Sequence, residues 1–541
     1  MNDNIKSFYL LEPVNNLQSI KDTSIWATDY RGKKVTASNI SYLITYGKIH
    51  RTEIDGKIFV DINELKNYYD HFHTSKEEAW KNKLGDDLNW ALSFDEYKEA
   101  ETTKHVHRLH PYKGKFIPQL VEYFLDSKTD KFKQQVYFQP GDIVYDPFCG
   151  SGTTLVQSNE LGINAIGNDV SEFNALISNV KIGNYDLLNI EVESKLINDA
   201  LINLYNKNNL AEFELELAAE LAPFNKEFFP SPNFKFRLKD KDFDEEKYGS
   251  EKQELFLKNY KQLVKKYNVN TTPVKDGSFL GKWYLPSIRN EIELARKLIS
   301  EIKNDDTRKI ATIILSRTIR SCRATTHSDL ATLKEPVTET YYCHKHGRIC
   351  KPLYTIISWW DRYSKDTIKR LQTFNTLKTN TFQFCLTGDS RNINLIDALK
   401  NKSPGLADKL RNQKIKGIFS SPPYVGLIDY HEQHAYAYDL FGFERKDEME
   451  IGKMKSGASK KAQEEYVAGI SDVLLNSRKY LSDDYDVFLV ANDKFNLYPI
   501  IANRAGMQIV NQFKRPVLNR TERDKAAYSE TIFHFKDNNN G

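Results

Sequence analysis

The sequence predicts an α/β protein built around a doubly wound, mostly parallel sheet. An apolar strand at 144–146 runs into a glycine-rich turn that opens a helix, and a second apolar strand ends on Asp169. Strand and helix patterns alternate again from 381 to 535. Such alternation favours parallel strands joined by crossover helices.

The length and charge of the chain limit the classes of protein to which it can belong. At 541 residues, two or three compact units are expected. Lys and Arg total 77 and Asp and Glu 73, so the net charge of +4 gives no global basic field, and nucleic-acid contacts would come from local patches. Five cysteines do not indicate a disulfide framework. No apolar run approaches the roughly 20 residues that span a bilayer, and residues 1–6 lack a signal-peptide core, so a cytoplasmic protein without membrane contact is expected.

Residues 1–74 are expected to form a small helix-turn-helix-like unit. The stretch before residue 30 has no clear period and is interpreted as an arm or a packed extension. Residues 36–49 predict a helical pair, residues 50–61 a hairpin with a type I′ turn at Asp55-Gly56, and residues 63–69 a closing helix capped near Asp61 or Asn63. The order resembles a small winged helix-turn-helix, and a packed subdomain is the equal alternative. A polar connector is expected at 75–104.

Three histidines open the stretch 105–184, which is expected to hold the first half of the sheet. His105, His107 and His110 lie close together, but no carboxylate or cysteine is near them in sequence, so no metal is predicted there. Pro118 is typical of the first turn of a helix.

The glycine-rich turn at 146–154 is the first candidate binding site. Gly150 and Gly152 remove side chains where a ligand must approach the backbone, and the following helix offers free N–H groups. Asp169 follows the glycines by about 20 residues, where a carboxylate would grip a ribose diol. Asp169 could equally cap the next helix.

Residues 185–380 are expected to form an inserted module, because this helix-rich and charge-rich stretch is too long for a simple crossover. Arg317, Arg320 and Arg323 have the spacing of one helical face, which could contact phosphates, although a solvated face is the commoner outcome.

A group of cysteines and histidines lies inside the insert. Cys343, His346 and Cys350 could bind zinc with Cys322 as a fourth ligand, and His327 is also upstream. The spacing matches no standard finger, so free thiols are favoured and no metal is predicted.

The sheet is expected to resume at 381–541, where a second candidate site follows the strand at 417–419. Ser421 precedes two prolines that stiffen the turn, and Tyr424 follows them. Ser421 Oγ and the Pro422 carbonyl can accept two N–H protons while Tyr424 stacks on a ring, which suits a planar heterocycle with an exocyclic amine. A candidate phosphate contact is formed near the C-terminus by Arg515, Arg520 and Arg523.

Asp-Pro-Phe-x-Gly-x-Gly at 146–152 and Ser-Pro-Pro-Tyr at 421–424, in this order, resemble the DNA amino-methyltransferases of bacterial restriction-modification systems. The resemblance covers 104–181 and 381–541, and implies a Rossmann-like methyltransferase sheet with S-adenosylmethionine as cofactor. It implies that the insert reads the target sequence in double-stranded DNA. It assigns cofactor binding to Lys115, Phe116, Asp146, Pro147, Phe148, Gly150, Gly152, Thr153, Asp169 and Asp389, and catalysis to Ser421, Pro422, Pro423 and Tyr424.

The chemistry of an amine target explains these residue types. The lone pair of an exocyclic amine is delocalised, so two acceptors that localise it favour direct attack on the sulfonium methyl without a covalent intermediate. The base must be flipped out of the duplex, and Tyr424 would replace part of its lost stacking, ~1–3 kcal/mol. Methylation of a ring carbon would need an activated thiolate, and the sequence has no Pro-Cys pair.

Serine at position 421 resembles the N4-cytosine branch more than the N6-adenine branch, where aspartate or asparagine is usual. An RNA or protein-glutamine amine methyltransferase is an alternative, because related prolyl turns serve those substrates. A DNA-binding regulator with an inert enzyme half is another. No nuclease signature stands out, so any restriction endonuclease is expected to be a separate chain.

Overall fold

The computed structural model describes residues 16–32, 34–112, 114–274, 276–327, 329, 333–426, 434–453, 457–518 and 527–538. Its centre is a seven-stranded sheet in the order β11-β12-β10-β9-β4-β5-β8. The five strands from β10 to β8 are parallel, and β12 is antiparallel to both of its neighbours. The strands are β4 (Ile143–Asp146), β5 (Asn164–Asp169), β8 (Gln383–Thr387), β9 (Ile415–Ser420), β10 (Leu481–Ala491), β11 (Met507–Pro516) and β12 (Ser529–Asp537).

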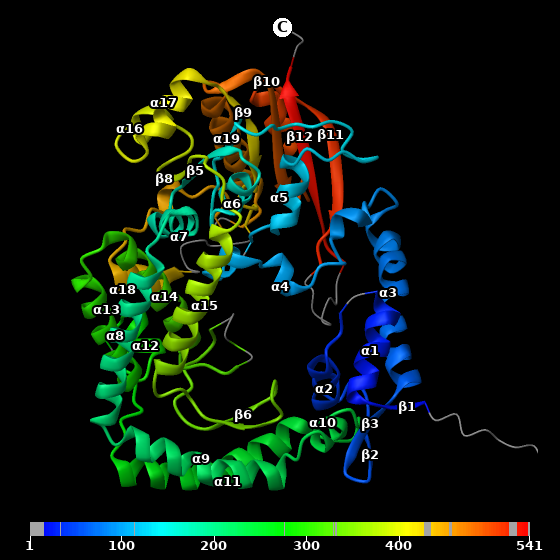
Figure 1. The fold of residues 1–541 in the computed structure, drawn as a ribbon, viewed down its shortest axis with the longest axis vertical. Helices are drawn as coiled ribbons and strands as arrows, with labels where there is room; N and C mark the ends of the chain where they lie inside the picture. The colour runs from blue at the N-terminus through cyan, green and yellow to red at the C-terminus, as the bar shows by residue number, and fades with distance from the viewer. Residues whose placement is uncertain are drawn as a thin grey trace, which may run out of the picture.

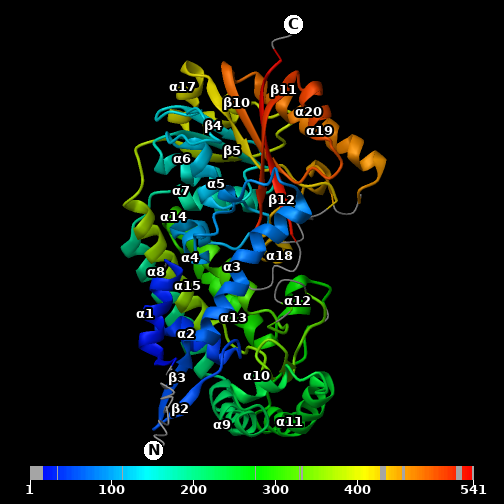
Figure 2. The same cartoon turned by 90° about the vertical axis from the view of Figure 1, so that its right-hand side faces the viewer.

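Helices cover both faces of this sheet, which confirms the doubly wound α/β prediction. Every residue of β4 and β5 is buried, as expected for parallel strands covered on two sides. Figure 2 shows α6 on one side of the sheet and α19 and α20 on the other. One core contains side chains of α5 (Pro118–Leu125), α6 (Thr153–Glu160) and α7 (Glu172–Ile182), and the other those of α16 (Leu395–Lys400), α17 (Pro404–Asn412), α19 (Lys460–Arg478) and α20 (Tyr498–Arg504).

The chain order places a topological switch between β4 and β9. From β4 the chain builds outward through β5 to β8, and from β9 it builds in the opposite direction through β10. Ligands of open α/β sheets bind where the carboxyl ends of such a strand pair diverge. Both sequence motifs follow these two ends, because one begins at Asp146 and the other follows Ser420.

A large helical insert lies between α7 and β8, as the sequence predicts. In Figure 1 it extends from the sheet down to α9 and α11. Its largest core joins its helices to α7 through Phe173 and Ile177. It contains the hairpin β6 (Tyr341–Cys343) and β7 (Arg348–Cys350), and the helices α8 (Leu187–Asn206), α9 (Leu210–Phe228), α10 (Asn233–Arg237), α11 (Glu245–Tyr267), α12 (Phe279–Trp283), α13 (Pro286–Glu301), α14 (Asp305–Ser321) and α15 (Ile357–Asn375).

The N-terminal unit contains a three-stranded sheet and three helices. The order is β1 (Leu17–Ser19), α1 (Ile20–Arg31), α2 (Ala37–Thr45), β2 (Thr52–Ile54), β3 (Lys57–Asp61) and α3 (Ile62–Leu84). The predicted hairpin turn is confirmed by positive φ at Asp55 and Gly56, and the predicted cap by Asp61, which accepts from the Asn63 amide at 2.7 Å.

Two expectations for this unit were wrong. Residues 36–49 contain one helix, and its partner is α1, from the stretch interpreted as an arm or a packed extension. Polar residues occupy most of α1, so its period is weak, and its inner face is marked by the burial of Thr23, Ser24 and Ala27. Helix α3 also continues to Leu84, past the boundary expected at residue 74.

The N-terminal unit touches both the core and the insert. Lys514 of β11 forms an ion pair with Asp87 at 2.9 Å, and its carbonyl accepts from the Asn89 amide. On the other side, the His50 ring stacks on Phe236 of α10 with centroids 4.4 Å apart. Core, N-terminal unit and insert therefore form a closed circuit of contacts (Figure 1). Among the described helices, none combines the length and apolarity that crossing a bilayer demands.

Candidate active site

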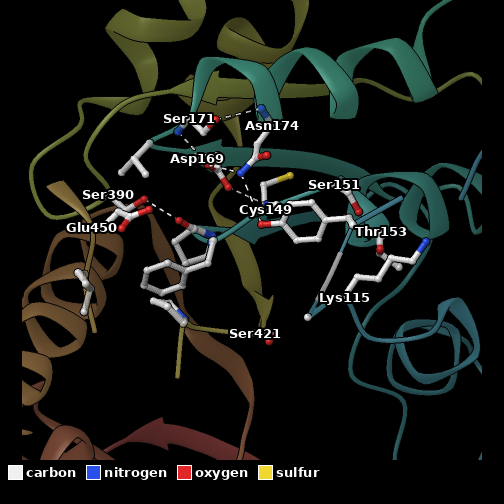
Figure 3. A pocket seen from close by; sticks show the side chains of 18 of the residues that line it. Lys115, Cys149, Ser151, Thr153, Asp169, Ser171, Asn174, Ser390, Ser421 and Glu450 are labelled. Carbon is white, nitrogen blue, oxygen red and sulfur yellow. Dashed lines mark hydrogen bonds between the residues drawn. The ribbon is translucent and has the colours of Figure 1, made fainter. Parts of the chain in front are cut away.

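A cavity of about 860 Å³ opens at the carboxyl ends of β4, β5 and β9. Its walls come from both motifs, since Gly150 of the glycine-rich turn and Ser421 and Pro423 of the prolyl turn line it together. Figure 3 shows Ser421 and Asp169 around this one space. The two motifs, more than 250 residues apart in sequence, thus share one site.

A buried hydrogen bond ties the two motifs together. Ser420, the last residue of β9, donates its hydroxyl to Asp146 Oδ1 at 2.5 Å. The same oxygen accepts from the Phe148 amide at 3.2 Å. Burial raises the pKa of Asp146 to about 6, although the bond from Ser420 opposes this shift. Asp146 does not line the cavity, so its place is beneath the site, where it joins β4 to β9.

The two glycines of the turn have different neighbours. A Cβ on Gly150 would lie 3.1 Å from the Tyr112 ring, at the cavity wall. A Cβ on Gly152 would lie 2.9 Å from Ser178 of α7, away from the cavity lining. Both residues have positive φ. Gly150 therefore lets the Tyr112 ring approach the turn closely at the cavity wall, whereas Gly152 lets α7 pack on the start of α6.

Asp169 ends β5 and lines the cavity. Its carboxylate accepts from the Gly150 amide at 2.8 Å, the Ser171 amide at 2.9 Å and Asn174 Nδ2 at 3.1 Å. A carboxylate has about four acceptor positions, so one remains for a ligand. Burial raises the pKa of Asp169 to about 6, against the lowering effect of these hydrogen bonds.

Asp389 follows β8 and lines the same cavity. Arg391 holds both of its oxygens, with Nη2 donating to Oδ2 at 2.6 Å and Nε to Oδ1 at 2.9 Å. Burial alone would raise the pKa of Asp389, but the hydrogen bonds from Arg391 outweigh it and lower that pKa. Asp389 is therefore ionised and faces the cavity as an acceptor.

Lys115 and Phe116 also line the cavity. Figure 3 shows Lys115 across the cavity from Ser390 and Glu450. Lys115 Nζ donates to the His107 carbonyl at 2.7 Å. Burial, with Arg108 and Arg370 nearby, lowers the pKa of Lys115 to about 8. Phe116 packs edge-on against Phe419 of β9 with centroids 5.4 Å apart. Phe116 thus connects the cavity wall to the core beneath the prolyl turn, and Lys115 connects it to the segment that contains His107.

The prolyl turn faces two cavities. Ser421 and Pro423 line the large one, whereas Tyr424 lines a second cavity of about 360 Å³ beside the carboxyl end of β10. The Tyr424 hydroxyl donates to Glu530 Oε1 of β12 at 2.8 Å. Asn492, the residue after β10, also lines this second cavity. Because β9 and β10 are parallel neighbours, the two cavities lie on the same edge of the sheet.

The large cavity brings together most of the predicted site residues. Those that line it are Lys115, Phe116, Pro147, Phe148, Gly150, Thr153, Asp169, Asp389, Ser421 and Pro423. Asp146, Gly152 and Pro422 lie outside its lining. Sequence reasoning missed several lining residues, because nothing local distinguishes them: Tyr112, Ser151, Ser171, Asn174, Ser390 and Glu450.

The structure contradicts the reading of Arg317, Arg320 and Arg323 as one helical face for phosphates. Arg317 is buried, forms a 2.6 Å ion pair with Asp366 of α15, and lies 4.0 Å over the Tyr363 ring. Helix α14 ends at Ser321, before Arg323. Spacing alone could not reveal the acid on α15 that pairs with Arg317.

The C-terminal arginine group is only partly described. The side chain of Arg515, on β11, is only 3% exposed, so it does not offer a surface contact for phosphate. Burial lowers its pKa, and Glu530 and Tyr424 oppose that shift. Arg520 and Arg523 fall outside the described residues.

The first histidine group has a partner that the sequence did not indicate. Glu160 of α6 lies 2.9 Å from His105 Nε2, and the same carboxylate pairs with Lys104 at 2.8 Å. His107 Nε2 lies 2.9 Å from Gln157. Glu160 is therefore the carboxylate that the sequence did not place beside these histidines, and ligand atoms of His105, His107 and Glu160 lie within 4.8 Å of one another.

Cys149 lines the cavity but is poorly suited to be a nucleophile. Burial raises the pKa of its thiol well above the usual value, as does neighbouring Cys385. The site therefore offers oxygen acceptors and no thiolate, which agrees with transfer to an amine.

The fold and the cavity define the class of protein. A doubly wound sheet with a glycine-rich turn and a facing prolyl turn is the arrangement of an S-adenosylmethionine-dependent methyltransferase. The cavity suits that cofactor, because Asp169 keeps a spare acceptor position and the buried Ser151 hydroxyl has no hydrogen-bond partner among the described residues.

Comparisons with known proteins give the family. The N6/N4 DNA methylase family model matches residues 10–179. The type II methyltransferase M.MjaII of Methanocaldococcus jannaschii is 46% identical over 544 residues, covering 98% of this chain and 99% of that protein. M.MvaI of Kocuria varians is 29% identical over 106 residues, 20% of this chain and 22% of its own. M.BsoBI of Geobacillus stearothermophilus is 23% identical over 355 residues, 65% of this chain and 56% of its own.

The chain belongs to the DNA amino-methyltransferases of restriction-modification type, and its methyl donor is S-adenosylmethionine.

Proposed function

We propose that this enzyme methylates the exocyclic N4 amine of cytosine at a specific site in double-stranded DNA, in the cytoplasm. The observation that carries the proposal is Ser421 in the wall of the cofactor cavity, at the start of a prolyl turn. A serine hydroxyl can accept a hydrogen bond from one N–H of the amine, and the Pro422 carbonyl can accept a hydrogen bond from the other. The N6 amine of adenine is the alternative target.

We assign cofactor binding to the residues around the large cavity and to the turn that supports it. Asp169 would hold the ribose hydroxyls and Asp389 the adenine amine, while Lys115 and Phe116 border the methionine end. The bound cofactor supplies an electrophilic methyl on a sulfonium. The full set is Lys115, Phe116, Asp146, Pro147, Phe148, Gly150, Gly152, Thr153, Asp169 and Asp389.

We assign catalysis to the prolyl turn, Ser421, Pro422, Pro423 and Tyr424. The prolines hold the two acceptors in fixed positions, so the amine lone pair is aimed at the methyl group without further reorganisation. Tyr424 would stack on the flipped base in the second cavity, at the carboxyl end of β10. Direct transfer of the methyl group requires the cofactor and the base to lie next to each other, as they would in adjacent cavities on one edge of the sheet.

The insert and the N-terminal unit are proposed to bind the DNA around the flipped base. Both units are linked to the core, and they contact each other at His50 and Phe236. A restriction endonuclease with the same target would be a separate chain. Recognition by the insert, and regulation by the N-terminal unit, belong to this proposal.

Sequencing that detects modified bases, applied to DNA from cells that express the protein, tests the target base and the site together. N4-methylcytosine at one recurring sequence is the expected result, and N6-methyladenine there would select the alternative. Labelled cofactor with duplex DNA, RNA or protein tests the substrate class. Label in RNA or protein alone would overturn the DNA proposal, and transfer to none of them would favour a regulator with an inert enzyme half.

A further inference from the structure

We propose that the insert contains a structural zinc site formed by His327, Cys343, His346 and Cys350. One ligand atom from each residue lies within 4.8 Å of the other three. Zinc bonds of about 2.3 Å to sulfur and about 2.0 Å to nitrogen place the corners of a tetrahedron roughly 3.3–3.8 Å apart. Two of these edges match directly, Cys343 Sγ to His327 Nδ1 at 3.7 Å and His346 Nδ1 to Cys350 Sγ at 3.4 Å.

The backbone of the β6–β7 hairpin aims three of these side chains at one point. Cys343 ends β6 and Cys350 ends β7. The tight turn between the strands has Gly347 at a φ of +61°, and the His346 amide donates to the Cys343 carbonyl at 3.0 Å. This turn brings His346 back over the cysteines. His327, from the segment after α14, completes the group, and its ring centroid is 4.3 Å from that of His346.

A metal would stabilise the face of the hairpin that carries the cysteines, because the apolar cluster on that face is very small, whereas Tyr342 and Ile349 on the other face pack into the largest core of the insert. Each strand has three residues, and the local cluster consists of Tyr341, Cys343 and Cys350 with Val337 packed on it. A two-stranded hairpin of this size is marginal alone, and small units often rely on a metal instead. Two buried thiols and two imidazoles in so small a cluster are better explained by a Cys2His2 zinc site than by packing.

The fourth ligand differs from the one that the sequence suggested. Cys322 is 2% exposed within the large core of the insert and is not part of the four-residue group. His344, directly after Cys343, turns outward to Glu245 at 3.1 Å. The Tyr341 hydroxyl lies 2.8 Å from His327 Nδ1, so it competes with the metal for that nitrogen and must turn aside when zinc binds.

The site would brace the part of the insert that meets the N-terminal unit. The carbonyl of Lys345, in the hairpin turn, accepts from Lys235 Nζ of α10 at 3.3 Å. Phe236 is the next residue of α10 and stacks on His50. Zinc would therefore stabilise the junction between the two units, independently of whether the core methylates cytosine or adenine.

Elemental analysis of the full-length protein, purified without chelators or a metal-affinity tag, tests the proposal. About one zinc per chain is expected, with almost none in the Cys343→Ser/Cys350→Ser double variant and a clear loss in His327→Ala. Three neighbouring variants, His344→Ala, Cys322→Ala and Tyr341→Phe, should keep their zinc. Loss of zinc in Cys322→Ala but not in His327→Ala would overturn the assignment of the fourth ligand.

A second measurement keeps the test independent of how the variants fold. Wild-type protein from which zinc has been removed should bind one Co²⁺ with the strong visible absorption of a tetrahedral site with two thiolates. Wild-type protein that contains no zinc and gives no such spectrum would overturn the proposal, as would a Cys343–Cys350 disulfide in protein purified under reducing conditions. Methyltransferase activity is measured separately, so failure of the cytosine proposal would leave this result unchanged.

Discussion

Tyr424 lies where two neighbouring cavities meet. It follows Pro423, which lines the large cavity, but its own side chain lines the second cavity and its hydroxyl donates to Glu530. The motif alone predicts an aromatic platform for a base. The tie to a carboxylate on the antiparallel strand β12 depends on tertiary structure, because more than 100 residues separate the two in sequence.

Tyr424→Ala should lower kcat about 10- to 100-fold, since stacking on one base contributes ~1–3 kcal/mol. The Kd for S-adenosylmethionine should stay unchanged, because Tyr424 does not line the large cavity. Steady-state methylation and isothermal titration measure the two quantities. Tyr424→Phe keeps the ring and removes the hydroxyl that donates to Glu530, so it should stay within about fivefold of wild type. Equal losses in both variants would assign the effect to the hydroxyl.

Asp169 leads to a prediction about pH. Its pKa is raised to about 6, so its contribution to folding stability is fully present below the unfolded value of 3.8 and is lost as pH rises through about 6. Ligand binding should run the opposite way, because the proposed ribose contact needs the ionised carboxylate. The affinity for S-adenosylmethionine should therefore fall as pH drops below about 6, by at most about tenfold per pH unit.

Asp169→Asn should weaken cofactor binding at neutral pH by roughly 1.5–3 kcal/mol, as for the loss of a hydrogen bond to a charged group. It should also flatten the pH profile, because an amide does not titrate in this range. Isothermal titration from pH 5 to pH 8 measures both effects. If Asp169→Asn keeps the wild-type pH profile, another group causes the pH dependence of cofactor binding. Asp146, with a pKa also raised to about 6, is the next candidate.

At the scale of elements, the strand pair β4 and β9 carries the site. Their parallel register places the ends of both motifs side by side, and the Ser420 to Asp146 bond closes the gap between the two turns. The sequence predicted both strands, both turns and the doubly wound order, since apolar runs, glycines and prolines are local signals. It assigned Gly152 to the ligand, however, whereas the near neighbour of that glycine is Ser178 of α7.

Ser420 and Ser421 provide a matched test of the roles of the β4–β9 strand pair and the prolyl turn. Ser420→Ala removes the donor to buried Asp146, so it should lower the free energy of unfolding by about 1–3 kcal/mol and reduce kcat by misplacing the prolyl turn. Ser421→Ala should reduce kcat with little change in unfolding, because its side chain faces the cavity. Chemical denaturation and methylation assays compare the two. Equal stability losses would contradict the division between support and catalysis.

At the scale of the whole molecule, three units contact one another in a closed circuit. The core holds the N-terminal unit through Lys514, and the insert holds it through Phe236. Such a closed set of contacts would keep the DNA-binding surfaces proposed for the insert and the N-terminal unit at fixed distances from the cavity. The entropy lost by fixing these units relative to one another would then be lost mainly on folding, so less would be lost when DNA binds.

Phe236→Ala should open this circuit at the junction with His50. Affinity for target DNA should fall about 3- to 10-fold, as expected when an aromatic pair worth about 0.5–1.5 kcal/mol is lost, while cofactor affinity stays constant. Fluorescence anisotropy with labelled duplex measures the first quantity. Phe382→Ala, at a 48% exposed aromatic on the core, is the matched control. Unchanged DNA affinity in Phe236→Ala would show that the junction does not position the DNA.

The α/β class, the helical stretch between the second and third parallel strands, the two motifs and ten of the 21 residues that line the large cavity could be predicted from the sequence. These features follow from apolar periodicity and from glycines and prolines, which act within a few residues of chain. Three contacts were visible only in the folded chain: Arg317 pairs with Asp366, Asp146 accepts from Ser420, and His327 rather than Cys322 lies with the cysteine group. Each of these contacts joins separate segments, and a side chain's charge or spacing does not specify which distant partner packing will bring within hydrogen-bond distance.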